Sequence, residues 1–328
     1  MTTTAARPHP LRSSVVVCTR NRAPSLVRTV QSILRTAGDY EVLVIDQGDD
    51  QAAEAALSSL QDIRLRYVRS TRRGKGAALN DGLRLATGDV VVCTDDDCEV
   101  PQGWVEAMTA VMAAQPAAAV VFCNVLPPLY DRTAGYVPAY ERQQDRCLTS
   151  IVEARRGLGL GAGMALRRET VLAFGGFDEA FGPGSRFASG DDWDISLRAM
   201  LRGFKVYDTS QVSVLHHGFR TFAEGRAHAY RDWISIGALC AKPIRAGYYG
   251  SGAALAAWLF AVEALWPPFR DVLKLRKPTG LSRIAGFSRG FAGGLCTPVE
   301  KQTLMFRSVQ PRHAGASMAA AHADHARK

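Results

Sequence analysis

Short apolar runs rich in β-branched residues alternate with longer helical patterns over the first third of the chain. The runs occupy residues 13–18, 41–46, 63–68, 89–94 and 118–123. Patterns of helical length lie between them at 23–35, 50–60, 75–86 and 102–114. This alternation is typical of a parallel sheet covered by helices, and near-continuous apolar runs indicate strands buried on both faces. We therefore predict an α/β fold with a Rossmann-like, mostly parallel sheet flanked by helices.

The pattern changes after Asn124. A segment bearing Pro and Gly residues extends to about Gly163 and precedes a second mixed block. That block is expected to hold a helix from about 167, a helix over 191–202 and short strands near 205–208 and 212–216. We predict a flexible start, a main domain with two halves, a C-terminal helical region and a disordered tail. The start covers residues 1–12, and the two halves of the domain cover 13–124 and 125–220. The helical region covers 221–308, and the tail covers 309–328.

The composition is that of a folded protein with a basic balance. Of 328 residues, 47% are hydrophobic and 22% charged, and the formal net charge of +9 favours an anionic partner. The basic residues form no long run and are not interleaved with aromatic residues, so we expect no nucleic acid partner. Seven scattered cysteines without a C-x-x-C pair argue against a disulfide framework or a zinc site.

The chain start lacks the apolar core of a signal peptide, which predicts a cytoplasmic protein. The stretch 248–266 is about long enough to span a membrane, but it contains Glu263, two glycines and many alanines. We interpret it as a helix that is buried or lies on a membrane surface. The basic C-terminal region could therefore make peripheral contact with the inner face of the membrane.

Three adjacent acids, Asp95, Asp96 and Asp97, follow the apolar run at 89–94 directly. In a parallel α/β sheet, ligands bind outside the carboxyl ends of strands, where these side chains should lie. Three neighbouring carboxylates repel one another unless a cation is near, and hard oxygen ligands suit Mg²⁺ or Mn²⁺. A solvated acidic loop that caps the next helix is the alternative interpretation.

Two further polar groups come later in the chain. Asp191, Asp192 and Asp194 open a predicted helix, where a carboxylate is stabilised as an anion and suits a general base; simple helix capping explains them as well. His216 and His217 follow an apolar run, and strand alternation would point only one of them at a site. We favour His216 as a metal ligand, although a packed histidine is the more ordinary case.

Basic and small residues occupy two loops at predicted strand ends. Thr19, Arg20, Asn21 and Arg22 follow the first run, and Lys75 stands in an RGKG string before a helix. Such loops are suited to bind anions. A solvated basic surface would give the same sequence pattern. The string lacks P-loop spacing, and no G-x-G-x-x-G follows the first run, which argues against a dinucleotide-binding protein.

Taken in chain order, these motifs resemble those of the family 2 glycosyltransferases. The order is T-R-N-R, a strand ending in Asp46, R-G-K-G, D-D-D, a Gly-rich segment, D-D-W-D and H-H, within about residues 13–220. The resemblance implies a GT-A fold and an inverting enzyme that uses a nucleotide sugar. It further implies a divalent cation, Mg²⁺ or Mn²⁺, and a glycan or lipid-linked acceptor.

The resemblance also implies roles for individual residues. Those that would bind the nucleotide sugar are Thr19, Arg20, Asn21, Asp46 at the base, Lys75, Asp95 and Asp96. Asp97 and His216 would meet the metal, and Asp192 would be the catalytic base. The donor sugar and the acceptor would lie near Gly161, Ala162, Gly163, Asp191 and Trp193. The sequence departs from the family at DQGDD, which places Asp49 less surely, and at Asp191, where the family has glutamate.

Two alternatives stay open at this stage. A nucleotidyltransferase also combines an α/β sheet with metal-binding carboxylates, but it would carry a Gly-rich basic loop where this chain has TRNRAPS. A non-catalytic nucleotide-sugar-binding protein would have no need for Asp95, Asp97 and Asp192 together. The sequence favours an enzyme.

Overall fold

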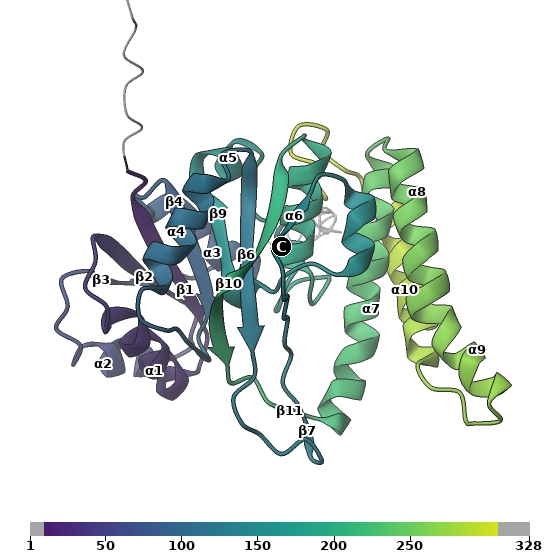
Figure 1. Ribbon diagram of the computed structural model, residues 1–328, viewed down its shortest axis with the longest axis horizontal. Helices are drawn as coiled ribbons and strands as arrows, with labels where there is room; N and C mark the ends of the chain where they lie inside the picture. Colours follow the sequence, from purple (N-terminus) through teal and green to yellow (C-terminus); the bar gives the residue numbers. More distant parts are fainter. Residues whose placement is uncertain (1–9, 308–328) are drawn as a thin grey trace, which may run out of the picture.

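The centre of the molecule is a nine-stranded, mostly parallel sheet (Figure 1), as seen in a computed structural model that describes residues 10–307. The strands follow the order β3-β2-β1-β4-β9-β6-β10-β5, and β8 also pairs with β10. They are β1 (Ser13–Thr19), β2 (Tyr40–Asp46), β3 (Leu65–Arg69), β4 (Val90–Asp95), β5 (Cys98–Glu99), β6 (Ala118–Leu126), β8 (Arg146–Leu148), β9 (Met164–Arg167) and β10 (Lys205–His216). A separate pair is formed by β7 (Gly135–Tyr136) and β11 (Arg220–Thr221).

Helices cover both faces of this sheet. They are α1 (Ala23–Leu34), α2 (Ala52–Leu57), α3 (Lys75–Leu85), α4 (Trp104–Ala114), α5 (Arg168–Ala173), α6 (Asp191–Leu201), α7 (Phe222–Arg245), α8 (Tyr249–Trp258), α9 (Trp266–Leu273) and α10 (Leu281–Leu295). Short helical turns are η1 (Ile151–Arg156) and η2 (Gly161–Gly163), and η3 (Leu259–Leu265) is a π-helical segment. Helices α1 and α4 pack on one face of the sheet, and α3, α6 and the C-terminal helices pack on the other.

Alternation along the central strands explains this two-sided burial. In β1, Val16 packs into one apolar cluster, while Val15 and Val17 pack into the other. Strand β2 divides in the same way, with Leu43 in the first cluster and Val42 in the second. Successive side chains of a strand point to opposite faces, so an uninterrupted apolar run fills both cores. The predicted α/β architecture is confirmed.

Two parts of the sheet differ from the prediction. Strand β9, which was not predicted, runs antiparallel between β4 and β6, directly before the helix that was predicted from about 167 and that the structure shows as α5. The two short strands predicted near 205–208 and 212–216 are one strand, β10, with an irregularity between Asp208 and Ser213. The local sequence contains no signal for either feature, because each depends on pairing with a distant strand.

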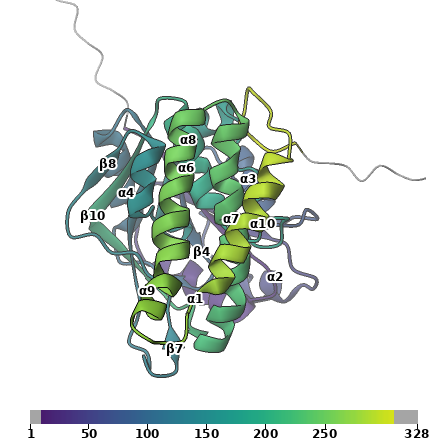
Figure 2. The same cartoon turned by 90° about the vertical axis from the view of Figure 1, so that its right-hand side faces the viewer.

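The C-terminal helices form a layer on one side of the sheet (Figures 1 and 2). Helices α7 and α10 approach closely through glycines: a Cβ built on Gly290 would lie 1.8 Å from the carbonyl oxygen of Ile234. A Cβ on Gly237 would lie 2.2 Å from the carbonyl oxygen of Phe287. Only glycine allows backbones to come this near, and the composition of these helices thus fixes how they pack.

One continuous helix runs from α8 through η3 to α9. In residues 10–307 this helix, Tyr249–Leu273, is long and apolar enough to cross a membrane by length and composition. Its π-helical segment precedes Pro267, which has no N–H and leaves the carbonyl of Glu263 without its usual donor. Arg283 Nη1 of α10 donates to that carbonyl at 3.1 Å.

The last described residues return to the core. The ring of Phe306 lies 5.7 Å from that of Phe181 and 5.6 Å from that of Phe187, measured between centroids. Its backbone N–H donates to Asp178 Oδ2 at 2.7 Å. The segment after α10 is therefore part of the same packed body as the sheet. Most of the predicted flexible start and all of the predicted disordered tail lie outside the described residues, 10–307.

Candidate active site

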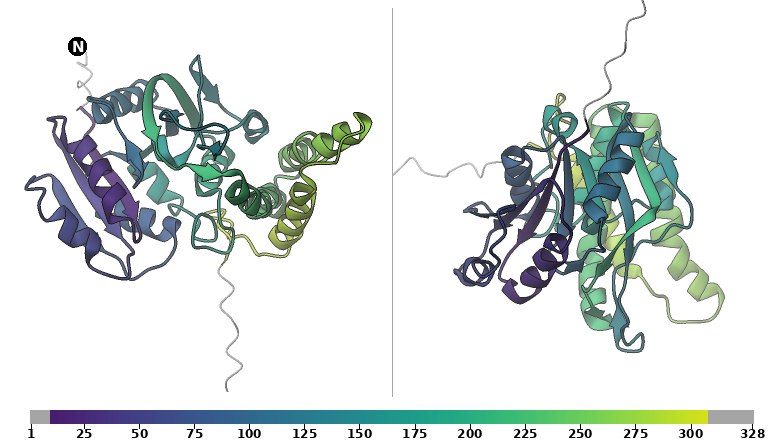
Figure 3. Two further views of the ribbon diagram at one scale, coloured as in Figure 1. Left: turned by 90° about the horizontal axis from the view of Figure 1, so that it is seen from below. Right: turned by 60° about the vertical axis from the view of Figure 1, so that its left-hand side comes forward.

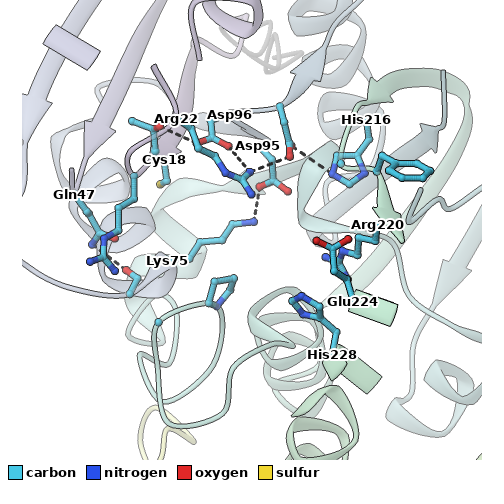
Figure 4. Close-up of a pocket in the computed structure, with 18 residues that line it drawn as sticks. Cys18, Arg22, Gln47, Lys75, Asp95, Asp96, His216, Arg220, Glu224 and His228 are labelled. Atoms are coloured by element: carbon cyan, nitrogen blue, oxygen red, sulfur yellow. Dashed lines mark hydrogen bonds and ion pairs between the residues drawn. The ribbon is translucent and has the colours of Figure 1, made fainter. Parts of the chain in front are cut away.

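A cavity of about 480 Å³ opens where β1, β4 and β10 end (Figure 4). Strands β1 and β4 pair in parallel, and β10 runs parallel to β6. Their carboxyl ends therefore meet at one edge of the sheet, where α/β proteins bind ligands. The walls also include the loop before α3, the loop before α6, and the first turns of α7.

The end of β4 and the end of β10 are brought together by the short strand β5. After Asp95 the chain turns, and Cys98 pairs antiparallel with His216. The backbone N–H of His217 donates to the carbonyl of Asp97 at 2.8 Å. As a result, one ligand atom each from Asp95, Asp97 and His216 lies within 4.8 Å of the others.

The geometry of this acidic group fits a divalent cation. Asp97 Oδ1 is buried, has no hydrogen bond partner, and lies 3.4 Å from His216 Nε2. His216 Nδ1 lies 3.0 Å from the carbonyl oxygen of Pro138. A carbonyl can only accept, so Nδ1 carries a proton. When Nε2 is deprotonated, as metal binding requires, it faces the carboxylates as a free ligand atom. A Cβ on Gly218 would lie 2.6 Å from this ring, and the glycine thus leaves room for it.

Arg22 compensates part of the negative charge. Its Nη1 donates to Asp96 Oδ1 at 3.1 Å and to Asp97 Oδ2 at 3.0 Å. Thr19 Oγ1 donates to the other oxygen of Asp96 at 2.7 Å, so both oxygens of that side chain are already bonded. Burial raises the pKa of Asp96. Burial opposes ionisation of Asp97 as well, but His216, Arg22 and Lys75 lower its pKa overall.

Lys75 lies between this acidic group and the start of α6. Its Nζ donates to Asp95 Oδ1. Burial would lower the pKa of Lys75, but Asp95, Asp191 and Asp192 raise it well above its usual value. A Cβ built on Gly161 would lie 3.6 Å from Lys75 Nζ and 3.7 Å from Asp192 Oδ2. The ammonium group therefore links the two sets of carboxylates.

Asp192 is held at the first turn of α6. Its Oδ2 accepts from the backbone N–H of Gly161 at 2.9 Å, and its Oδ1 from that of Trp193 at 2.8 Å. Burial, and then the neighbouring charge of Asp191, raises the pKa of Asp192 to about 7, against the opposing effect of Lys75. Burial raises the pKa of Asp191 too. A carboxyl group with a pKa near neutrality can accept and release a proton at physiological pH.

A smaller cavity of about 140 Å³ adjoins the first, and Arg22 lines both. It is also lined by Asn21 and Asp46. Asp46 is fully buried and accepts from Tyr67 Oη at 2.8 Å and from the backbone N–H of Gly48 at 2.7 Å. The predicted residues Asn21 and Asp46 therefore lie beside the main cavity and not in its wall.

Asn21 has a left-handed backbone with φ 57°, and its side chain explains why. Its Oδ1 accepts from the backbone N–H of Asp49, and its Nδ2 donates to Asp49 Oδ2, both at 2.9 Å. Arg73 Nη2 bonds to the other oxygen of Asp49 at 2.6 Å. The hydrogen bond from Asn21 and, after it, the contacts from Arg73 lower the pKa of Asp49. Together these contacts hold the loops after β1 and β2 against each other.

The other predicted site residues divide into two groups. Those that line the main cavity are Thr19, Arg20, Lys75, Asp95, Asp96, Asp97 and His216. Gly161, Ala162, Gly163, Asp191, Asp192 and Trp193 are not in its wall. They lie at the end of the segment before β9 and at the start of α6, beyond Lys75. His217 is 39% exposed and has Glu99 as its nearest acid, at 3.8 Å.

Several cavity residues were not predicted. Gln47 follows β2 and donates to the carbonyl of Gly74 at 3.0 Å, and Pro183 accepts from the backbone N–H of Lys75 at 3.0 Å. Glu224 and His228 belong to the first turns of α7 and point into the cavity (Figure 4). Thr221 and Glu224 form a capping box at the start of α7, where the predicted helical region begins.

Part of the chain is similar to known glycosyltransferases. Residues 14–158 match the family described as Glycosyl transferase family 2. A beta-monoglucosyldiacylglycerol synthase of Synechocystis sp. is 26% identical over 260 residues, which are 70% of this chain and 50% of the relative. Polypeptide N-acetylgalactosaminyltransferase 5 of Caenorhabditis elegans is 31% identical over 135 residues, 38% of this chain and 21% of the relative. The chain thus spans half or less of the length of these curated relatives.

Solved structures extend the likeness over the whole fold. A mannosyltransferase from Pyrobaculum calidifontis, in complex with GDP-Man and Mn²⁺, is 21% identical with a TM-score of 0.59, and the match covers 88% of each chain. S. aureus TarS is 14% identical with a TM-score of 0.53, over 86% of this chain and 91% of that one. These likenesses show a common fold, the GT-A fold. The match over residues 14–158 makes the first half of the chain similar to glycosyl transferase family 2.

Proposed function

We propose that this protein is an inverting glycosyltransferase that moves a sugar from a nucleoside-diphosphate sugar to a hydroxyl group of a glycan or lipid-linked acceptor. The observation that carries the proposal is the position of Lys75. On one side of it lie Asp95, Asp97 and His216, which suit a cation, and on the other lies Asp192, which suits a base. The prediction of a cytoplasmic protein stays a prediction.

The donor would lie across the two adjoining cavities. Structures of similar fold are complexes with GDP-Man and with UDP, which supports a nucleoside diphosphate as the group to place here. The base would enter the smaller cavity beside Asn21 and Asp46, and the ribose would lie near Thr19 and the acids after β4. Arg20 and Lys75 would then meet the diphosphate with positive charge.

Asp97 and His216, with Asp95, would hold a divalent cation beside this diphosphate. A bound cation would neutralise the charge that develops on the leaving group. The buried and unpaired Asp97 Oδ1 supports this role, because a desolvated carboxylate oxygen needs a positive partner. An imidazole ligand favours Mn²⁺ over Mg²⁺, which prefers a shell of oxygen ligands.

Asp192 would take the proton from the acceptor hydroxyl. Its two backbone hydrogen bonds fix its orientation, and the raised pKa makes its carboxylate a stronger base than an exposed aspartate. The donor sugar and the acceptor would lie near Gly161, and Asp191 would act through its charge on Asp192. Attack from the face opposite the leaving diphosphate inverts the anomeric centre.

The proposal separates the effects of two substitutions. We expect Asp97→Ala and Asp192→Asn each to lower turnover by about a hundredfold or more. Asp97→Ala should also remove the Mn²⁺-dependent part of donor affinity, whereas Asp192→Asn should leave donor affinity within about twofold of wild type. Isothermal titration of the donor with and without Mn²⁺, and release of the nucleoside diphosphate, measure the two effects.

The donor for these measurements comes from a thermal-shift screen of UDP-, GDP- and dTDP-sugars with Mn²⁺, since a bound donor raises the melting temperature. Equal loss of donor affinity in both variants would contradict the separate roles. Turnover near the wild-type level in Asp192→Asn would remove that residue as the base. A protein that binds donors tightly but releases no product with any acceptor would be a binding protein instead.

A further inference from the structure

Exposed apolar side chains gather where the C-terminal helices turn. Along α9 and the connection to α10 they are between 49% and 97% exposed. We call them the tip surface: Trp266, Phe269, Val272, Leu273, Leu275 and Leu281. Viewed from below, this part of the chain projects away from the sheet (Figure 3). A projecting group of large apolar side chains marks a surface for a partner.

Cations surround the tip surface. Residues 266–283 contain five basic residues, Arg270, Lys274, Arg276, Lys277 and Arg283, and a single acid, Asp271. Asp271 is buried, and its Oδ2 accepts from the backbone N–H of Thr279 at 2.9 Å. The charge that this region presents to a partner is therefore almost entirely positive. An apolar face that carries tryptophan and phenylalanine among lysines and arginines suits an anionic lipid interface.

A second exposed apolar spot lies at the same end of the molecule. Leu129, Phe219 and Phe222 are exposed, next to the strands β7 and β11. Figures 1 and 2 both place β7 and α9 at this end, to which the arrowhead of β6 points. It is thus the end at which the strands open into the active-site cavity, and Phe219 is itself part of the cavity wall.

We propose that this end of the protein docks on the surface of an anionic phospholipid bilayer through the tip surface and the spot around Phe219 and Phe222. Helix α9 lies in the interface and does not span the membrane. The other end of the same long helix packs into the protein core through Leu255 of α8 and Leu259 of η3. The apolar side chains enter the headgroup boundary, and Lys274, Arg276 and Lys277 contact lipid phosphates.

This docking turns the cavity mouth toward the bilayer. It follows, resting on the proposed function, that the acceptor hydroxyl is carried by a lipid and reaches Asp192 from the membrane surface. The exposed Phe219, at the cavity wall and in the docking end, is where such an acceptor would pass. A soluble donor would enter from the aqueous side of the same cavity.

Vesicle flotation tests the docking. The full chain is mixed with vesicles of phosphatidylcholine alone or with added phosphatidylglycerol, at low and at high salt. We expect flotation only with phosphatidylglycerol and a loss at high salt. Partitioning should weaken about tenfold or more in an apolar variant, Trp266→Ala with Phe269→Ala and Leu273→Ala. It should weaken about tenfold or more in a charge variant, Lys274→Glu with Arg276→Glu and Lys277→Glu.

A matched control variant reverses the charge of three exposed basic side chains elsewhere on the protein. It should float like wild type. The control changes are Arg66→Glu, Arg156→Glu and Lys205→Glu. Circular dichroism melting shows whether each variant is folded, and a blue shift of Trp266 emission, absent in Trp266→Phe, shows insertion. Wild-type protein that does not float with anionic vesicles, or equal flotation of all variants, overturns the proposal.

A second copy of the chain is the other occupant to be tested. Light scattering that shows a dimer dissociated by the apolar variant, with no vesicle binding, would make the tip surface a dimer interface and overturn docking. Donor hydrolysis in solution separates this proposal from the function. The apolar variant and the charge variant should hydrolyse the donor like wild type. If neither they nor the wild type hydrolyse it while flotation behaves as expected, the proposed function fails and the docking stands.

Discussion

At the scale of single residues, two adjacent histidines have different surroundings. His216 is buried with Nε2 3.4 Å from Asp97 Oδ1, whereas His217 is 39% exposed near Glu99. We expect His216→Ala to weaken Mn²⁺-dependent donor binding by roughly tenfold or more and His217→Ala to change it little. Titration of the donor at several Mn²⁺ concentrations measures both, and equal effects of the two changes would contradict the assignment of His216.

The environment of Asp192 predicts a pH dependence. Because burial and Asp191 raise its pKa to about 7, a growing fraction of the base is protonated as the pH falls below that value. We expect kcat/KM to drop about tenfold for each pH unit on the acid side and to level off above about pH 8. The acid limb should be absent from the residual activity of Asp192→Asn. A limb centred near pH 4 would show that the carboxyl group is not perturbed in the working enzyme.

The sequence predicts the acids and His216 of the site because their position depends on local information. Strands in a parallel sheet end at one edge, so residues that follow Thr94 and Leu215 meet there. Arg22 was predicted only as part of an anion-binding loop, and its pairing with Asp96 and Asp97 was not, since these partners are more than seventy positions away. A basic residue after a strand looks like a solvated one until its partner is known.

At the scale of elements, the contact between α7 and α10 offers a sharp comparison within one helix. A Cβ on Gly290 would meet the backbone of Ile234 at 1.8 Å, whereas a Cβ on Gly293 would meet only Arg186 Nη2, at 3.9 Å. We expect Gly290→Ala to lower the free energy of unfolding by about 1–3 kcal/mol or more, because the helices must separate.

Gly293→Ala is the control for this change. Alanine in a helix is favoured over glycine by about 0.5–1 kcal/mol, so this variant should be slightly more stable than wild type. Urea unfolding followed by circular dichroism gives both values. Similar effects of the two alanines would mean that α7 and α10 do not pack as closely as the structure places them.

The elements themselves were predicted unevenly. Helix α1 and strand β1 begin where predicted, because Pro24 and an apolar run mark their starts. The helix predicted from about 167 is α5, but strand β9 before it was missed, because only pairing on both sides with β4 and β6 makes residues 164–167 a strand. Pairing of this kind joins residues more than forty positions apart and is absent from any short window of sequence.

At the scale of the whole molecule, the C-terminal helices share one apolar core with the sheet. The cluster that contains Val16 and Leu43 also contains Trp233, Leu255 and Phe287. A domain boundary at 221 stays a prediction. In the structure, the regions before and after this position pack into the same apolar core. Sequence periodicity gives the faces of single helices but not which sheet they cover, because that depends on contacts across the chain.

Phe306 tests this joint core. It is buried against Phe181 and Phe187, far from it in the chain. We expect Phe306→Ala to lower the free energy of unfolding by about 3–5 kcal/mol and to leave one transition for the whole chain. Urea curves from fluorescence and circular dichroism should coincide. The control Leu275→Ala, at a 97% exposed position, should change the free energy by less than about 0.5 kcal/mol. An early transition confined to the C-terminal helices would contradict a shared core.

Lys242 of α7 shows how the shared core limits the exchange of C-terminal helices between similar proteins. Its Nζ bonds to Asp194 Oδ1 in the first turns of α6 and to Asp178 Oδ2, and all three side chains are buried. Asp194 follows Asp192 by two positions, so the charge of Lys242 secures the helical turn that carries the proposed base. A chimera that grafts another helical region after residue 221 would leave the buried Asp178 without its cation and Asp194 with Arg198 alone, unless the graft supplies an ammonium group at this point. The region around α6 therefore cannot be combined freely with the C-terminal helices of another protein.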